Sequence, residues 1–233
     1  MRRPQRLPGV AYSRVDLSHY HLYAAFLFAL HAERLEEKAS PMAGSDALFR
    51  YRSFVMGAIL SSVAFLEAKI AELRTDAADG PFVGLSATGL TAAQCTALEA
   101  ALNVRAPLLE RFQAALRALA KSPFKADRQP YRAVALVVAL RNFLVHFPAE
   151  WHAHPNGESG PLLQRELPLI ERQLRRQFPS TKFADPSRPF FPDHCLSAGC
   201  ARWAAEASLL FAREFSARAG MPMIHPRPIL RGV

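Results

Sequence analysis

The amino-acid sequence predicts an all-α protein, a single helical bundle of about five to seven helices. Half of the 233 residues are hydrophobic, which is enough to form a substantial core. Phe54, Ile59, Val63, Leu66 and Ile70 recur at steps of three to five residues, which is the periodicity of a helix. No segment shows the alternation of β-branched residues that indicates a strand. Helices packed around one core are therefore the expected architecture.

The first two helices are delimited by capping residues and by a proline. Asp16 precedes an apolar series and is expected to cap a first helix, which ends before Pro41. Ser45 or Asp46 is expected to cap a second, long helix that runs to about Ala77.

A loop and a pair of shorter helices follow. Residues 79–89 contain three glycines and a proline, which predicts a loop. Thr91 then begins a helix at 92–103, and a second helix at 107–120 opens with a proline in its first turn.

Prolines also delimit the helices of the second half. A fifth helix is expected at 130–147, and a shorter basic helix at 162–178 contains Pro168, which predicts a kink or a delayed start. Residues 179–192 carry four prolines and are expected to be extended, and the last helix is expected at 196–219. The apolar face of that last helix is expected to consist of Trp203, Leu210, Phe211 and Phe215.

The chain is strongly basic, with 29 Lys and Arg residues against 20 Asp and Glu residues and a net charge of +9. Only five of the basic residues are lysines, so the excess is almost entirely arginine. Guanidinium groups bind phosphate oxygens in pairs. The charge therefore favours a polyanionic partner, and the alternative is an arginine-rich composition that only keeps the protein soluble.

The cysteines and the apolar runs favour a soluble cytoplasmic protein. Cys95, Cys195 and Cys200 are odd in number and lack the spacing of a disulfide framework, which indicates a reducing compartment. The apolar runs at 54–66 and 133–140 are shorter than the roughly 20 residues of a membrane-spanning helix. We therefore expect no membrane partner.

The fifth expected helix carries the candidate site. Its AVALVVAL segment is apolar nearly all round, which predicts a position at the centre of the bundle. Asn142 and His146 then share one stripe of the helix, with Arg141 on the adjacent stripe. Ala135 and Ala139 lie on this polar side and leave room for another backbone or a ligand. Because a buried arginine and histidine without partners are costly, this side should meet water, a phosphate or another chain.

The pattern Arg141-Asn142-x-x-x-His146 resembles the RNxxxH ribonuclease motif of the HEPN superfamily (higher eukaryotes and prokaryotes nucleotide-binding domain). A bare R-x4-H should occur roughly once by chance in this composition, and Arg14–His19 is such a match. Arg141–His146 differs because Asn follows the Arg and the pair lies late in an apolar helix.

Two further segments resemble this superfamily more diffusely. SSVAFLEAKIAEL is similar to an early helix with a mid-helix glutamate, here Glu67, and PDHCLSAGCARWAAEASLLFAREF is similar to a closing helix. The resemblance covers residues 45–220 as a HEPN-like bundle, with 1–44 as an N-terminal arm and first helix and 221–233 as a C-terminal tail.

The resemblance implies metal-independent cleavage of single-stranded RNA at a composite site that two copies form across a two-fold axis. His146 would accept the 2′-hydroxyl proton or protonate the leaving oxygen, Arg141 would hold the scissile phosphate, and Asn142 would orient the phosphate or the imidazole. The products would carry 2′,3′-cyclic phosphate and 5′-hydroxyl ends. The implied partners are RNA, a second copy and, for a toxin or defence effector, an antitoxin or regulatory protein. No cofactor is expected.

Other interpretations of these residues remain open. The domain could be a catalytically silent HEPN-like module that binds RNA, a nucleotide or a protein, or an unrelated helical interaction protein. Arg141 and His146 could instead pair with carboxylates at a helix interface. Glu67 could anchor Arg141, tune the histidine, or simply be solvated.

The sequence does not favour a metal site. His146, His152 and His154 lack the helical i, i+4 pairing of zinc ligands, and His194 with Cys195-x4-Cys200 does not form a finger motif.

The basic helix is a weaker candidate for RNA binding. Arg165, Arg172, Arg175 and Arg176 could follow an RNA backbone, with Arg172 and Arg176 on one helical stripe. The alternative is a solvated charged face, partly neutralised by its glutamates.

Overall fold

The computed structural model describes residues 15–38, 45–80, 89–147, 169–178, 181, 183, 190–221 and 228. Within these ranges the protein is helical and contains no strand, which confirms the all-α prediction. The elements are α1 (Ser18–Glu37), α2 (Ser45–Asp79), α3 (Ala92–Leu102), α4 (Leu108–Ala118), α5 (Tyr131–Val145), α6 (Leu169–Leu174), the kinked turn η1 (Phe190–His194) and α7 (Ala198–Ala219).

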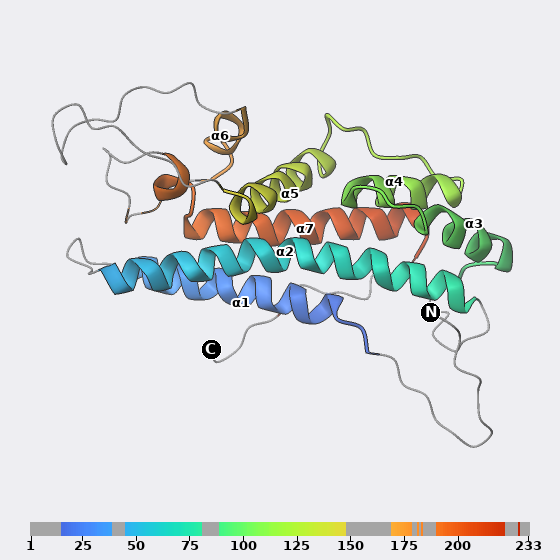
Figure 1. The fold of residues 1–233 in the computed structure, drawn as a ribbon, viewed down its shortest axis with the longest axis horizontal. Helices are drawn as coiled ribbons and strands as arrows, with labels where there is room; N and C mark the ends of the chain where they lie inside the picture. Colours follow the sequence, from blue (N-terminus) through green and yellow to red (C-terminus); the bar gives the residue numbers. More distant parts are fainter. Residues whose placement is uncertain are drawn as a thin grey trace, which may run out of the picture.

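The long helix α2 is the element on which the others assemble. It packs against α1, α7, α3, α5 and α4, and α7 in turn contacts α1, α5 and α4. Figure 1 shows α1 along one side of α2, with α5 and α7 on the other side and α3 and α4 near the C-terminal end of α2. The site helix α5 therefore rests on two long helices.

One stripe of α2 forms the centre of the core. Ile59, Val63, Leu66 and Ile70 are fully buried, as the periodicity predicts. Phe54, the remaining member of the predicted stripe, is half-buried and lies between α1 aromatics, with its ring centroid 5.0 Å from that of His31.

The same helix passes a length-and-composition test for a membrane span. Residues Asp46–Asp79 contain an 18-residue window with a mean hydropathy of 1.7, and 44% of that window is buried inside the protein. The long helix contains only one of the two apolar runs, 54–66, and the residues on either side of that run lengthen the apolar window. This pattern is also typical of the core helix of a soluble protein.

Two of the predicted helix starts have different outcomes. Thr91 forms a capping box with Gln94, because its hydroxyl accepts from the Gln94 N–H and the Gln94 side chain accepts from the Thr91 N–H. The prediction for Asp16 is wrong, because α1 begins at Ser18 and its N-cap residue has no side-chain cap. Instead, the Ser18 N–H donates to Glu72 of α2 at 2.8 Å. A long-range carboxylate thus replaces the local cap.

Three predictions for the second half of the chain concern the start of α6, the extended segment before Pro192 and the apolar face of α7. α6 begins at Leu169, and residues 162–168 of the predicted helix lie outside the described residues. Residues Phe190–His194 form the turn η1, in which Phe191 has extended dihedrals (φ −107°, ψ 131°), so the predicted extended conformation is present at Phe191, directly before Pro192. Leu210 is also not part of the α7 core, since it is 56% exposed while Phe211 and Phe215 are buried.

A buried glutamine joins α4 to the segment that leads into α5. The Gln113 side chain donates to the Phe124 carbonyl at 2.9 Å and accepts from the Phe124 N–H at 2.8 Å. The side chain therefore satisfies both backbone groups of a buried residue.

We expect Gln113→Leu to lower the free energy of unfolding by about 2–4 kcal/mol, because Phe124 would keep a buried N–H and C=O without partners. Chemical denaturation followed by circular dichroism measures this loss. Gln177 is the matched control, since its amide makes one 3.3 Å bond within a single turn. Gln177→Leu should cost less than about 1 kcal/mol, and equal losses in both variants would contradict the assigned role.

Candidate functional site

Helix α5 is buried on one face only. Val134, Val137 and Leu140 are fully buried against the α2–α7 pair, whereas Ala135 and Ala139 are half-exposed. The expectation that α5 lies at the centre of the bundle is therefore wrong, and α2 takes that position. The small side chains of Ala135 and Ala139 lie on the outer face of α5 between Arg132 and Asn142, which are both exposed.

The three motif residues lie on the last turn of α5 at the surface. Asn142 and His146 are exposed, and Arg141, one position around the helix, has a side chain that is 23% exposed. His146 is the C-cap residue, and its N–H donates to the Asn142 carbonyl at 3.0 Å. An amide and an imidazole thus face solvent together, beside a partly buried guanidinium.

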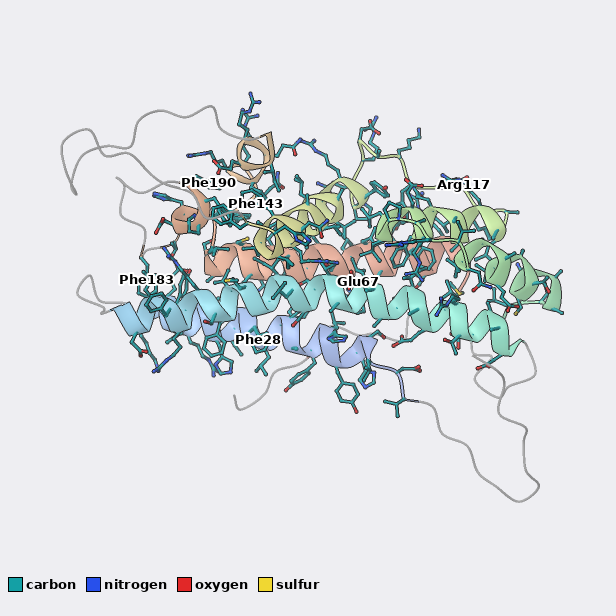
Figure 2. The ribbon with its side chains drawn as sticks, viewed as in Figure 1. Phe28, Glu67, Arg117, Phe143, Phe183 and Phe190 are labelled. Atoms are coloured by element: carbon teal, nitrogen blue, oxygen red, sulfur yellow. The ribbon has the colours of Figure 1, made fainter. Side chains whose placement is uncertain are left out.

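Arg141 is held by a carboxylate from α2. Its guanidinium donates to Glu67 Oε1 in an ion pair, and the Glu67 side chain is 49% exposed. Glu67 thus anchors Arg141, which is one of the roles that the sequence left open. Figure 2 shows Glu67 on α2, near the middle of the helix.

The histidine has a different environment from the arginine. Among the described residues, none forms a side-chain hydrogen bond or ion pair with His146. One alternative was that Arg141 and His146 both pair with carboxylates at a helix interface. Within the described part of the chain, this pairing is observed for Arg141 alone.

An aromatic cluster holds the end of α5. The Phe143 ring lies 5.2 Å from Phe147 and 4.6 Å from Phe191 of η1, measured between ring centroids. Figure 2 shows Phe143 of α5 near Phe190 of η1. Sequence reasoning missed this cluster, although the i, i+4 spacing of Phe143 and Phe147 was a signal. These rings fix the turn that carries Asn142 and His146.

The predicted basic helix is shorter than expected. Arg172 is exposed on α6, but Arg175 and Arg176 lie in the turn after it, so Arg172 and Arg176 do not share a helical stripe. The Arg175 guanidinium lies over the Phe190 ring at 4.4 Å from the centroid. Arg165 lies outside the described residues. Because α6 packs on α5, the exposed arginines lie near the end of α5 that carries His146.

Two further arginines near Glu67 were missed. Arg74 lies two helical turns after Glu67 on the same face of α2, and Arg111 extends from α4. Burial and the Arg74 guanidinium lower the pKa of Arg111, whereas the Glu67 carboxylate acts to raise it. The seven-residue spacing of Glu67 and Arg74 was visible in the sequence, but the approach of α4 was not.

The described residues contain no group of histidine, cysteine and acidic side chains that could hold a metal ion. His152 and His154 lie outside the described residues. Cys195 and Cys200 are fully buried free thiols. Burial raises the pKa of the Cys200 thiol, and its neighbour Cys195 acts in the same direction. The Cys200 thiol is therefore a poor metal ligand at neutral pH.

Comparisons with known proteins leave the resemblance as it stands. No protein-family model, curated protein or solved structure matches the chain. The likeness to the HEPN superfamily therefore depends on the residues of the RNxxxH motif.

A double-mutant cycle tests the anchoring of Arg141. We expect Glu67→Ala and Arg141→Ala to show a coupling energy of about 0.5–1 kcal/mol in denaturant unfolding, decreasing with added salt, because the pair is only partly exposed. Glu110 and Arg117 form the control pair, with charged atoms 4.0 Å apart and side chains more than half exposed. Their coupling should be close to zero, and a zero coupling for Glu67 and Arg141 as well would show that the pair does not form in solution.

Proposed function

We propose that the protein is a metal-independent endoribonuclease that cleaves single-stranded RNA at a composite site formed by two copies of the chain. The observation that supports this proposal most strongly is the arrangement at the end of α5. There a guanidinium, an amide and an imidazole lie on one turn, and a carboxylate from a second helix fixes the guanidinium.

In the proposed reaction these groups have separate tasks. The imidazole of one His146 accepts the proton of the ribose 2′-hydroxyl, and the 2′-oxygen attacks the phosphorus. The bond from phosphorus to the 5′-oxygen then breaks, and the imidazolium of the other copy's His146 donates a proton to that oxygen. The products are a 2′,3′-cyclic phosphate and a 5′-hydroxyl, with no net consumption of water or cofactor.

Arg141 contributes electrostatic stabilisation in this scheme. Its guanidinium would donate to the nonbridging oxygens as charge grows on the phosphate. The ion pair with Glu67 restricts the guanidinium before RNA binds, so less conformational entropy is lost on binding. Asn142, exposed beside it, would orient the phosphate or the imidazole.

The scheme uses a second copy because the motif of one chain supplies a single imidazole, that of His146, for the two proton transfers. The half-exposed Ala135 and Ala139 would let two α5 helices approach closely, which would bring the two motifs to one cleft. The proposed ribonuclease would act as a toxin or as a defence effector. An antitoxin or regulatory protein would then bind near the same face of α5.

The alternative is a catalytically silent HEPN-like domain that binds RNA, a nucleotide or a protein. One observation favours it: the guanidinium of Arg141 is already engaged by a carboxylate, as in a purely structural ion pair. In that case the motif would support the fold and the exposed arginines would provide the binding.

The reaction can be tested with His146→Ala in the presence of a chelator. We expect wild-type protein to cleave single-stranded RNA in EDTA and the variant to be at least about 100-fold slower, because a general acid and base is removed. Arg141→Ala should have a similar effect, since it removes charge stabilisation. The cleavage products should accept phosphate at the 5′ end without prior dephosphorylation.

The control substitutions are made at Arg14 and His19, which match the bare R-x4-H spacing by chance. Arg14→Ala and His19→Ala, the latter an exposed histidine on α1, should leave the rate within about twofold. Circular dichroism should show that all four variants remain folded. Cleavage by His146→Ala at the wild-type rate would exclude the site, and RNA binding without any cleavage by the wild type would favour the silent domain.

The composite site predicts that dimerisation and activity are lost together. Ala139→Glu places a charge on the outer face of α5, where a single chain tolerates it but two copies would repel each other. We expect a monomer by analytical ultracentrifugation and a loss of cleavage. Leu210→Glu, at an exposed apolar position of α7, is the matched control and should remain dimeric and active. A wild-type protein that is monomeric and fully active would contradict the composite site.

A further inference from the structure

The outer face of α5 carries a straight stripe of residues that ends in the motif. The stripe has five members at alternating steps of three and four positions: Arg132, Ala135, Ala139, Asn142 and His146. Side chains at such steps lie on one side of a helix. The first member and the last two are exposed, and the two alanines between them are half-exposed. The stripe is therefore one continuous surface, with a guanidinium at one end and the amide and imidazole of the motif at the other.

Most of the net charge of the chain lies in the segment that contains this stripe. Residues 111–147 include seven Lys and Arg residues and a single acidic residue, Asp127. Six of the nine net positive charges therefore belong to these residues. Because charges of one sign that are close together raise the local concentration of a polyanion, this charge distribution favours RNA binding around α5.

Arg132 differs from the other arginines near α5 in having no carboxylate partner. Arg141 pairs with Glu67 of α2, and Arg128 pairs with its neighbour Asp127 at 3.6 Å. Within the described ranges, the Arg132 side chain makes no hydrogen bond or ion pair. Its guanidinium therefore keeps its donors for a ligand.

The segment that leads into Arg132 is fixed to the bundle. Arg218 of α7 donates to the Pro123 carbonyl at 3.2 Å, and its guanidinium lies over the ring of the buried Phe124, 4.2 Å from the centroid. The Arg132 N–H donates to the carbonyl four residues earlier at 2.9 Å, so helical hydrogen bonding is already present there. Figure 1 shows this segment as the yellow-green connection between α4 and α5. Because the backbone at Arg132 is already ordered, a ligand bound there loses little affinity to ordering.

We propose that the outer stripe of α5 is the track of the RNA strand, on which Arg132 binds a second phosphodiester at a distance from the scissile one. This inference rests on the proposed ribonuclease function. The fork of a guanidinium can bind two nonbridging oxygens of one phosphate. Ten residues separate Arg132 from Asn142, which corresponds to about 15 Å along α5. The second phosphate therefore belongs to a nucleotide beyond the two that flank the scissile bond.

The alanines between the two ends allow the strand to lie close to the helix. In the proposed dimer the two α5 helices form the walls of the cleft, and the strand would follow one wall from the motif toward the N-terminal end of α5. Arg132 would position the substrate there without contacting the reacting atoms.

Binding can be measured without cleavage in a His146→Ala background, with a single-stranded RNA oligonucleotide titrated at several salt concentrations. We expect the additional substitution Arg132→Gln to weaken binding about fivefold or more and to reduce the slope of log K against log salt by about 0.7, the value for one phosphate contact on a single strand. Arg213→Gln removes the same charge from an exposed position of α7 and should leave both quantities nearly unchanged. Arg132→Lys should bind with intermediate affinity, since it keeps the charge but not the fork.

The length of the substrate separates a remote contact from a general loss of activity. With otherwise wild-type protein and the oligonucleotide, Arg132→Gln should raise KM about fivefold and change kcat by less than about twofold, because the lost contact is the same in ground and transition states. A dinucleotide has one phosphodiester, which the motif itself would hold, so Arg132→Gln should cleave it at the wild-type rate. An equal loss on both substrates would contradict a remote contact.

Four further outcomes separate this inference from the proposed function. If RNA is cleaved but Arg132→Gln behaves like Arg213→Gln, the track is excluded and the function stands. If RNA binds in an Arg132-dependent way but the wild type never cleaves it, the track stands as a binding surface and the ribonuclease is excluded. If Arg132→Gln sediments as a monomer and the wild type as a dimer, Arg132 belongs to the contact between the copies and the track is excluded. If no RNA binds at all, both are excluded.

Discussion

The burial of one apolar stripe of α2 determines where the other helices can lie. That stripe is too long for a single neighbour to cover, so α1, α7, α5 and α3 each shield part of it. Because a stripe of this kind occupies only part of the circumference of a helix, the remaining surface of α2 stays available for polar groups. Glu67 lies on that remaining surface, and it can reach α5 only because α5 packs on the same helix. The core thus sets the geometry of the site without contributing a residue to its chemistry.

The same constraint explains why the surface charges near α5 are unbalanced. A helix that packs on α2 through its apolar face must bring its adjacent positions to the border between core and solvent. Arg141 and Arg111 both occupy such border positions, where a guanidinium is partly desolvated and a carboxylate is needed. Glu67 supplies one carboxylate for this border, and Arg141 takes it. Arg111 is therefore left without an ion-paired carboxylate among the described residues.

The sequence could predict what depends on local spacing. The helical period of Ile59 and Val63 predicted the buried stripe, and the Thr91 cap depends on a residue only three positions away. It could not predict the partner of Ser18, because Glu72 lies 54 positions further along the chain. The Arg141–Glu67 pair has the same character, with a separation of 74 positions, and the sequence left three roles open for Glu67. Contacts between residues so far apart in the sequence are determined by how the helices pack.

The net charge of +9 is a weak guide to function once the pairing of arginines is known. Many guanidinium groups have a carboxylate partner in the structure, and such groups contribute little to the attraction of a polyanion at short range. Those with an ion-paired carboxylate include Arg50, Arg52, Arg117, Arg128, Arg202 and Arg218. The exposed arginines of the α6 region are not among these, and α6 packs on α5, the helix that carries the motif. In the proposed ribonuclease, an RNA strand drawn by long-range charge would therefore gain close contacts along a path from α6 to the end of α5. Because close contacts displace counterions and distant charges do not, affinity along this path should depend on salt more steeply than the net charge alone explains.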